Sequence, residues 1–238
     1  MSGVDQLSVE LFADGADLDG MLEMHSKSYI KGLTTNPTLM KKAGITDYTK
    51  FAKQVLEKIS DKPISFEVFS DDVDEMLAQG RKIALWGDNV FVKIPVTNTK
   101  KESTARIVKI LAHEGVKVNV TALMTTEQVH QINEALSPQV PSNVSVFAGR
   151  IADTGLDPIT IMKESLKILK DNSSCKLIWA SPRELLNVFQ ADEIGCHIIT
   201  ATNDILKKLS LVGKDLEEYS LDTVKMFYSD ATAAGFTI

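Results

Sequence analysis

The chain has 238 residues, of which 44% are hydrophobic and 24% are charged, and its formal net charge at pH 7 is -6. This length and composition suit a globular protein with one substantial core, and the acidic balance argues against a nucleic-acid partner, which normally requires a basic face. The first ten residues hold no apolar signal core and no apolar run could span a membrane, so we expect a cytoplasmic protein with no membrane partner.

Short apolar runs alternate with longer amphipathic segments along almost the whole chain. The runs that we expect to be strands are Leu11–Ala13, Gly32–Thr34, Ile64–Val68, Val90–Ile94, Lys117–Val120, Val144–Ala148, Lys176–Trp179 and Ile198–Ala201. Helices are expected between them, among others at Val73–Ala84, which Asp71 and Asp72 would cap, at Lys101–His113, which Gly115 would end, and at Asp157–Leu169.

This alternation of strands and helices predicts the α/β class with a parallel sheet. About eight strand–helix units in about 240 residues match the size of a (β/α)8 TIM barrel. A doubly wound open sheet is the main alternative that the pattern leaves open. A nucleotide-binding sheet of that kind would want a Gly-rich phosphate loop after the first strand, and Asp14-Gly15-Ala16-Asp17 does not provide one.

The chain shows no linker rich in Pro, Gly or Ser and no sequence repeat, so we expect a single barrel domain over residues 1–238. A further helical pattern lies at Leu221–Ile238, with Met226 and Phe227 among its apolar residues. It predicts a C-terminal helical extension over residues 214–238. That extension could cover one end of the barrel or pack on a neighbouring subunit.

The residues that most often bind metals are scattered along the chain. Cys175 and Cys196 do not form a Cys-x-x-Cys motif, and the four histidines form no His-x-x-x-His pair. A disulfide framework or a metal centre is therefore not expected.

One predicted strand is interrupted by a charged residue. A central parallel strand is buried on both faces and usually forms a continuous apolar run, but Lys93 lies within the run Val90–Ile94. Alternation puts Lys93 on the same face as Phe91 and Pro95, so it points into the barrel if Phe91 does. Burial favours the neutral amine, which is the form that attacks a carbonyl carbon. A lysine that reaches solvent from the strand end is the alternative.

Polar residues also stand at the ends of other predicted strands, where barrel enzymes carry their chemistry. They are Asp14, Asn36, Glu67, Thr121, Ser145, Arg150, Ser181 and Arg183. Simpler explanations exist for several of them: Asp14 could cap a helix, Asn36 could form a turn, and Arg150 could make a surface ion pair. Glu67 is harder to explain in this way, because a carboxylate inside a buried strand needs a partner.

Five short motifs occur in order between about residue 11 and residue 201. They are Leu33-Thr34-Thr35-Asn36-Pro37-Thr38, Val92-Lys93-Ile94-Pro95-Val96-Thr97, Asn119-Val120-Thr121-Ala122, Val146-Phe147-Ala148-Gly149-Arg150-Ile151 and Ala180-Ser181-Pro182-Arg183. In this order they resemble the transaldolase family, including its small branch and the related fructose-6-phosphate aldolases. The Thr-Thr-Asn-Pro and Val-Lys-Ile-Pro motifs are the specific ones.

The resemblance implies a class I aldolase barrel in which a lysine on the fourth strand forms a Schiff base with the substrate. Lys93 lies on the fourth predicted strand and is therefore the implied nucleophile. Asp14 resembles the general acid/base, and Glu67 and Thr121 resemble the pair that holds the catalytic water. Because the iminium acts as the electron sink, no metal or organic cofactor is implied.

The same resemblance implies a binding site for a sugar phosphate. Asn36 and Ser145 resemble the residues that bind the sugar hydroxyls, and Arg150, Ser181 and Arg183 resemble the phosphate site. Two guanidinium groups and a hydroxyl suit a phosphate dianion.

Two positions separate transaldolases from aldolases within this family. The aldolases resemble each other in a tyrosine where this chain has Phe147 and in a glutamine where it has Glu67. Both differences favour transfer, because a phenyl ring cannot hydrogen-bond the catalytic water as a phenol can. Phe147 could also be a simple core aromatic. Pro182 departs from the family, which usually has an aromatic residue between the serine and the arginine.

The implied activity is the transfer of a dihydroxyacetone unit from fructose 6-phosphate or sedoheptulose 7-phosphate to an aldose phosphate, a reaction of the pentose phosphate pathway. One alternative is a fructose-6-phosphate aldolase that releases free dihydroxyacetone. Another is a non-catalytic sugar-phosphate-binding barrel. The small branch often assembles through its C-terminal helix, so a homo-oligomer is also implied.

Overall fold

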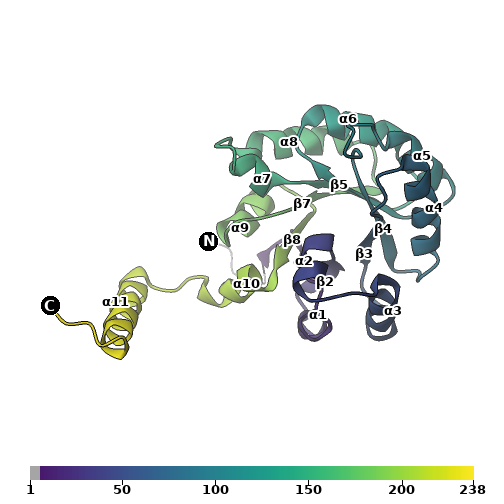
Figure 1. Ribbon diagram of the computed structural model, residues 1–238. Helices are drawn as coiled ribbons and strands as arrows, with labels where there is room; N and C mark the ends of the chain where they lie inside the picture. Colours follow the sequence, from purple (N-terminus) through teal and green to yellow (C-terminus); the bar gives the residue numbers. More distant parts are fainter. Residues whose placement is uncertain (1–5) are drawn as a thin grey trace.

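The computed structural model describes residues 6–238 and contains a closed barrel of eight parallel strands (Figure 1). Each strand pairs with the next along the chain, and the last pairs with the first. The strands are β1 (Glu10–Asp14), β2 (Ile30–Thr34), β3 (Ile64–Glu67), β4 (Val90–Pro95), β5 (Val118–Leu123), β6 (Ser142–Val146), β7 (Cys175–Trp179) and β8 (Ile198–Thr202). The predicted (β/α)8 barrel is confirmed, and the open doubly wound sheet is excluded.

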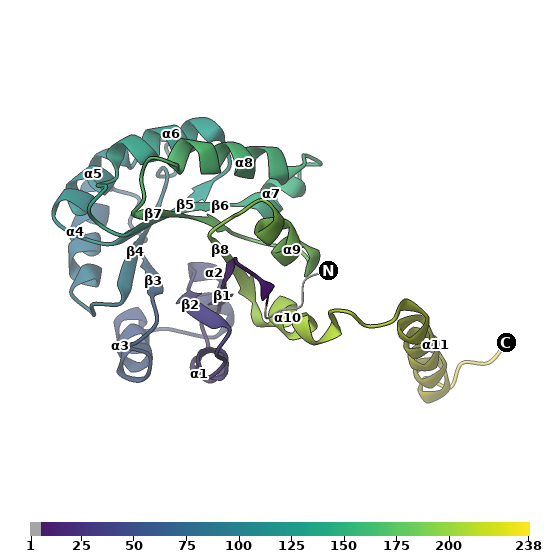
Figure 2. The same ribbon diagram turned by 180° about the vertical axis from the view of Figure 1, so that it is seen from behind.

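Helices surround this barrel, as Figure 1 and the reverse view in Figure 2 show. They are α1 (Leu18–His25), α2 (Pro37–Lys42), α3 (Tyr48–Lys58), α4 (Val73–Ala84), α5 (Ala105–His113), α6 (Thr126–Ala135), α7 (Ala148–Ala152), α8 (Pro158–Leu169), α9 (Leu186–Glu193), α10 (Asn203–Leu206) and α11 (Leu216–Ala233). A 3-10 helix over Lys207–Leu211 follows α10. Among residues 6–238, no helix has both the length and the hydrophobicity needed to cross a membrane.

Some predicted boundaries differ from the structure for local reasons. Asp72 caps α4 as predicted, whereas Asp71 instead accepts hydrogen bonds from the backbone and side chain of Thr99. Helix α5 begins at Ala105 rather than at Lys101, because Lys101 has a φ of 65°, which is incompatible with a right-handed helix. The chain leaves α5 through Gly115, whose φ of 83° suits a glycine after a helix.

The predicted strand Val144–Ala148 was wrong at both ends. Strand β6 starts at Ser142 and stops at Val146, and Ala148 already belongs to the short helix α7. Strand β5 continues past Val120 to Leu123. The differences at Val146 and Leu123 fall at the carboxyl ends of strands, where the chain turns and the apolar pattern no longer reports the backbone conformation. At the amino end of β6, the polar pair Ser142 and Asn143 hides the start of the strand from the apolar pattern.

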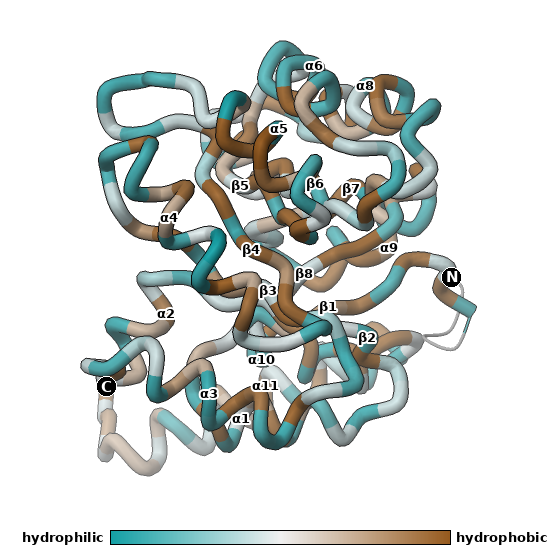
Figure 3. The backbone as a smooth tube through the Cα atoms, turned by 90° about the vertical axis from the view of Figure 1, so that its right-hand side faces the viewer, coloured by the Kyte–Doolittle hydropathy of each residue, from teal (hydrophilic) through white to brown (hydrophobic). Residues whose placement is uncertain are grey.

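The hydrophobic residues form two separate clusters. The large one fills the layer between the barrel and the helices. Figure 3 shows that strands such as β4 are largely hydrophobic, whereas helices such as α6 and α8 contain both hydrophobic and hydrophilic residues. The small one comprises Phe12, Ile178, Ala180 and Ile198, with Phe147 packed against it. Alternation along β1 places Phe12 on the same face as Asp14, so this second cluster lies inside the barrel.

Gly32 makes room for the inner cluster. A Cβ at this position would lie 2.4 Å from the ring of Phe12, far closer than atoms approach one another. The ring therefore occupies the space where a larger residue of β2 would project. The barrel interior around this cluster is therefore filled with side chains, as in other barrels of this size.

Helix α11 lies apart from the barrel. Figures 1 and 2 show it projecting beyond α10, and none of its residues is buried. The suggestion that the C-terminal extension covers a barrel end is therefore wrong for this structure. The exposed apolar side chains of the extension are Leu216, Tyr219, Leu221, Val224, Met226, Phe227, Tyr228, Phe236 and Ile238.

Candidate active site

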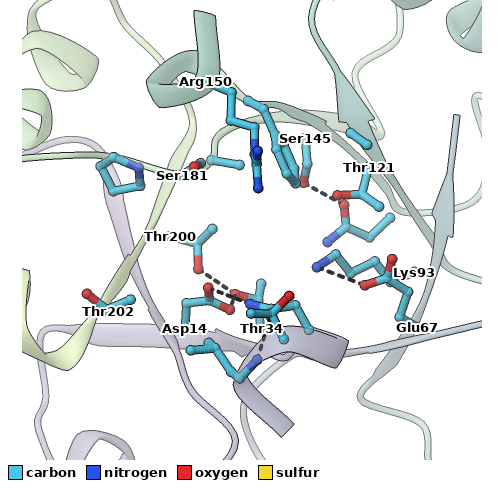
Figure 4. A pocket seen from close by; sticks show the side chains of 18 of the residues that line it. Asp14, Thr34, Glu67, Lys93, Thr121, Ser145, Arg150, Ser181, Thr200 and Thr202 are labelled. Atoms are coloured by element: carbon cyan, nitrogen blue, oxygen red, sulfur yellow. Dashed lines mark hydrogen bonds and ion pairs between the residues drawn. The ribbon is translucent and has the colours of Figure 1, made fainter. Parts of the chain in front are cut away.

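A cavity of about 380 Å³ opens at the carboxyl ends of the strands (Figure 4). All the site residues predicted from the sequence line it: Asp14, Asn36, Glu67, Lys93, Thr121, Ser145, Phe147, Arg150, Ser181 and Arg183. They come from seven strands or the segments that follow them, and Arg150 lies in helix α7. Residues far apart in the sequence meet here because parallel strands bring their carboxyl ends to the same face of the barrel.

Lys93 lies on β4 with only 6% of its surface exposed, so it does not reach solvent. In the barrel register it lies beside Glu67 on β3 and Asn119 on β5. Its Nζ donates a hydrogen bond of 2.9 Å to the carbonyl oxygen of Thr35 and lies 3.3 Å from Oε2 of Glu67. The amine is thus held inside the cavity by one carbonyl and one carboxylate.

Asp14 ends β1, and its carboxylate accepts two side-chain hydrogen bonds. Thr34 Oγ1 donates to Oδ1 at 2.8 Å and Asn36 Nδ2 donates to Oδ2 at 3.0 Å. Burial raises the pKa of Asp14, and Lys93, Thr34 and Asn36 act in the opposite direction. Asp14 does not cap α1, because Asp17 does so.

Asn36 makes two side-chain hydrogen bonds in the structure. Its Oδ1 accepts a hydrogen bond from the backbone N–H of Leu39 and caps α2, while Nδ2 holds Asp14. Capping satisfies an amide group that would otherwise have no partner. The same cap fixes the orientation of the amide that faces the cavity.

Glu67 is the second buried carboxyl group of the cavity. Burial raises its pKa, Lys93 lowers it, and the negative charge of Asp14 raises it. The backbone of Glu67 is fixed by the hydroxyl of Tyr48, which accepts from the Glu67 amide at 2.7 Å and donates to its carbonyl at 3.0 Å. The lysine is the partner that a carboxylate in a buried strand was predicted to need.

Thr121 projects from an irregular part of β5. The register with β6 shifts between Val120 and Leu123, and Ala122 has a φ of 64°, an uncommon value for a residue with a side chain. The Oγ1 of Thr121 is buried and has no hydrogen-bond partner within residues 6–238. A water or a substrate oxygen in the cavity would satisfy it.

A second chain of hydrogen bonds crosses the cavity floor. Ser145 Oγ donates to Oδ1 of Asn119 at 2.7 Å, and Asn119 Nδ2 donates to Oγ of Ser65 at 3.0 Å. Because the proton of Ser145 is committed to Asn119, its hydroxyl is left to accept from a ligand.

Five polar residues that line the cavity are not among the predicted site residues: Thr34, Thr38, Asn119, Thr200 and Thr202. A signal for all of these except Thr38 was present in the alternation of the strands. Thr34 and Asn119 lie two residues before the predicted site residues Asn36 and Thr121, and the Thr-Ala-Thr end of β8 has the same period-two pattern.

The two arginines have different environments. Arg183 makes a two-point ion pair with Asp153, and its Nη1 also donates to Ser181 Oγ at 3.1 Å. Arg150 projects from α7 into the cavity (Figure 4). The surface ion pair considered for Arg150 is thus made by Arg183. Ser181 has a φ of 60°, so the turn before Pro182 takes an unusual conformation and keeps Ser181 in the cavity wall.

Gly149 allows the loop after β7 to approach α7. A Cβ on Gly149 would lie only 1.6 Å from the carbonyl oxygen of Ser181, so any side chain would push this loop away. We expect Gly149→Ala to raise the KM for a phosphorylated substrate by about tenfold or more, since Ser181 and Arg183 would move. Steady-state kinetics measures this, with Gly15→Ala as the control, because a Cβ there meets Met21 at an ordinary 3.7 Å. An unchanged KM would show that the close approach is not needed for binding.

The barrel, with its polar cavity at the carboxyl ends of the strands, has the form of a (β/α)8-barrel enzyme. Residues 11–238 match the family model described as transaldolase/fructose-6-phosphate aldolase. The chain belongs to the transaldolase/fructose-6-phosphate aldolase family. Among residues 6–238, no group of three or more His, Cys, Asp and Glu side chains is placed to hold a metal ion.

Relatives of similar length support this membership. The chain is 32% identical to a probable transaldolase of Ruegeria sp. (strain TM1040), with 97% of this chain and 100% of the relative covered. It is 32% identical to a probable transaldolase of Methanococcus maripaludis, covering 90% and 97% of the two chains. It is 34% identical to that of Clostridium acetobutylicum, covering 84% and 89%. The chain is therefore an enzyme of the transaldolase family.

Proposed function

We propose that this enzyme transfers a dihydroxyacetone unit from a ketose phosphate to an aldose phosphate through a Schiff base on Lys93. The observation that carries the proposal is the buried amine of Lys93, which projects into the cavity 3.3 Å from the Glu67 carboxylate. A buried amine with a carboxylate at hand can lose a proton and attack a carbonyl carbon.

Formation of the Schiff base involves Lys93, Glu67 and Thr121. Glu67 takes a proton from the ammonium group of Lys93, and the free amine attacks C2 of the ketose. The resulting carbinolamine receives a proton on its hydroxyl group and loses water, which leaves the iminium. We assign Glu67 and Thr121 the role of holding that water, which is supported by the Thr121 hydroxyl having no hydrogen-bond partner within residues 6–238.

Cleavage requires a base near the C4 hydroxyl, and we assign this role to Asp14. Its carboxylate removes the C4 hydroxyl proton, the C3–C4 bond breaks, and the electron pair moves into the iminium to give an enamine on Lys93. The aldose phosphate departs. An acceptor aldose phosphate then enters, the enamine attacks its carbonyl carbon, and Asp14 returns the proton to the new hydroxyl.

The remaining residues bind and orient the sugar phosphate. Arg150, Arg183 and Ser181 line one wall with donors that suit a phosphate dianion. Asn36 and Ser145 offer an amide and a hydroxyl to the sugar. The ion pair with Asp153 uses Nε and one N–H of Nη2 of Arg183, and Ser181 accepts from Nη1, so one N–H on each terminal nitrogen is left for phosphate.

Fructose 6-phosphate and sedoheptulose 7-phosphate are the proposed donors, and the fructose-6-phosphate aldolase activity is the second candidate. Phe147 favours transfer, because its ring packs against the apolar cluster inside the barrel and offers the cavity no hydrogen-bonding group. Water in the cavity is then less well placed to protonate the enamine.

Product analysis with and without erythrose 4-phosphate tests the proposal. A transferase converts fructose 6-phosphate only when the acceptor is present, and it forms sedoheptulose 7-phosphate without free dihydroxyacetone. A lyase releases dihydroxyacetone in the absence of the acceptor. If neither product forms and borohydride traps no adduct on Lys93, the barrel is a non-catalytic sugar-phosphate-binding protein.

We also propose that α11 packs against another copy of the chain. Its exposed apolar side chains form a patch that a monomer would leave in water. We expect Phe227→Asp, which places a charge at a 61%-exposed position of this helix, to shift the protein to a smaller species in sedimentation velocity. Lys225→Asp, a polar change on the same helix, is the control. A wild-type protein that sediments as a monomer at micromolar concentration would contradict the proposal.

A further inference from the structure

A hydroxyl group from strand β8, that of Thr200, is linked to the carboxylate of Asp14 through the hydroxyl of Thr34. Oγ1 of Thr200 lies 2.5 Å from Oγ1 of Thr34, and Oγ1 of Thr34 lies 2.8 Å from Oδ1 of Asp14. The three residues come from β8, β2 and β1, and β8 lies beside β1 only because the barrel closes. Thr34 and Thr200 are 2% and 7% exposed, so bulk water does not compete for these bonds.

The proton of each hydroxyl has a defined position in this series of hydrogen bonds. A threonine hydroxyl has a single proton. When Asp14 is ionised it can only accept, so the proton of Thr34 points to the carboxylate. The contact between the two threonines then requires Thr200 to donate and Thr34 to accept.

We propose that Thr200 is a positioning residue for Asp14, acting through Thr34 to hold one carboxylate oxygen in the orientation that accepts the substrate proton. The proposal rests on the role assigned to Asp14 above. With Thr34 on Oδ1 and Asn36 on Oδ2, each carboxylate oxygen accepts one side-chain hydrogen bond. Each oxygen keeps a lone pair for the C4 hydroxyl.

These hydrogen bonds also affect the pKa of Asp14. The groups that face it are Lys93, whose charge lowers its pKa, Glu67, which repels its charge, and Arg150, which projects into the same cavity. Burial works against the ionised form, and the hydrogen bond from Thr34 opposes that effect. A hydroxyl that itself accepts a hydrogen bond is a stronger donor, so Thr200 strengthens the bond from Thr34 to Asp14.

A purely structural role for Thr200 is the competing explanation. Thr200 pairs with Phe12 in the barrel register and lies two residues after Ile198, on the same face of β8. Both Phe12 and Ile198 belong to the inner apolar cluster. A residue that only fills space there would be replaced by valine without loss, because valine has nearly the same shape. The hydroxyl matters only if the hydrogen bond to Thr34 does.

The test compares Thr200→Val, Thr200→Ser, Thr34→Val and the double variant Thr34→Val/Thr200→Val in the full-length enzyme. We expect Thr34→Val to move the acid limb of the kcat/KM profile to higher pH by about one unit, since the pKa of Asp14 rises when it loses a donor. Thr200→Val should move it in the same direction by roughly 0.3 to 0.5 units and lower kcat several-fold with little change in KM. Thr200→Ser keeps the hydroxyl and should restore the wild-type profile.

The double variant decides between the two explanations. If Thr200 acts through Thr34, adding Thr200→Val to Thr34→Val has no further effect on the acid limb. The proposal would be overturned if Thr200→Val shifted the acid limb equally in the wild type and in Thr34→Val. It would also be overturned if Thr200→Val melted like the wild type and left the acid limb unshifted. If Thr200→Val does not fold, a wild-type pH profile for Thr34→Val overturns the proposal. Thr200 could then not act on Asp14 through Thr34, because the hydrogen bond from Thr34 would itself have no effect.

Borohydride trapping separates this result from a failure of the proposed function. In Thr200→Val we expect the Schiff base on Lys93 to form as in the wild type, since Asp14 acts after that step. A wild-type enzyme that forms no adduct and transfers nothing would overturn the proposed function and this inference together. An active wild type with Thr200→Val indistinguishable from it would overturn this inference alone.

Discussion

Replacing Lys93 by methionine is expected to abolish transfer, with kcat/KM falling by at least about 10⁴-fold. Methionine fills a similar volume at this 6%-exposed position but cannot form an imine. Glu67 loses the charge that lowers its pKa, so it takes up a proton instead of remaining an unpaired buried anion. The variant should therefore fold, and a thermal melt together with a coupled transfer assay checks both parts of the prediction.

Mass spectrometry after incubation with fructose 6-phosphate and borohydride gives the direct measurement for this variant. Wild-type enzyme should carry one adduct that maps to Lys93, and Lys93→Met should carry none. Lys109→Met is the matched control, because Lys109 is exposed on the outer helix α5. An adduct of equal yield in Lys93→Met would rule out the Schiff-base mechanism at this residue.

Asp14→Asn is the change with the second largest expected effect. Asparagine can keep the hydrogen-bonded position but cannot remove the C4 hydroxyl proton, so we expect kcat to fall by about 10² to 10⁴-fold. Formation of the iminium does not need Asp14. Borohydride should therefore trap the uncleaved six-carbon sugar phosphate on Lys93, whereas the wild type yields the three-carbon unit.

The matched control for this variant is Asp17→Asn. Asp17 lies three residues further along and caps α1 through the backbone N–H of Gly20, and asparagine is an equally good cap. We expect wild-type turnover and a wild-type adduct from it. A three-carbon adduct in Asp14→Asn, formed at the wild-type rate, would show that another group is the base.

The pH dependence of the wild type should reflect the same carboxyl group. Burial raises the pKa of Asp14 above its ordinary value, and the ionised form is the one that accepts the substrate proton. Transfer should therefore decline on the acid side at a higher pH than an exposed aspartate would give. In Asp14→Asn that limb should disappear from whatever activity remains.

The sequence was enough to predict the barrel and ten of the residues that line its cavity. Alternating strands and helices follow from local hydrophobic periodicity, which each segment carries by itself. Lys93 and Glu67 stood out because a charge inside an otherwise apolar strand has no local explanation. The roles of the other polar residues came from the resemblance of short motifs, and the structure brings all of those residues to one cavity.

Other features depend on contacts between segments that the sequence does not connect. Thr200 meets Thr34 across 166 positions only because β8 closes the barrel against β1, and the strand register sets which hydroxyls face each other. Arg183 pairs with Asp153 rather than standing free because α7 lies beside the loop after β7. The position of α11 is of the same kind: its apolar pattern predicts a helix, but only tertiary packing decides that the helix leaves the barrel uncovered. Periodicity encodes which face of an element is buried, whereas the partner of that face is chosen by the packing of the whole chain.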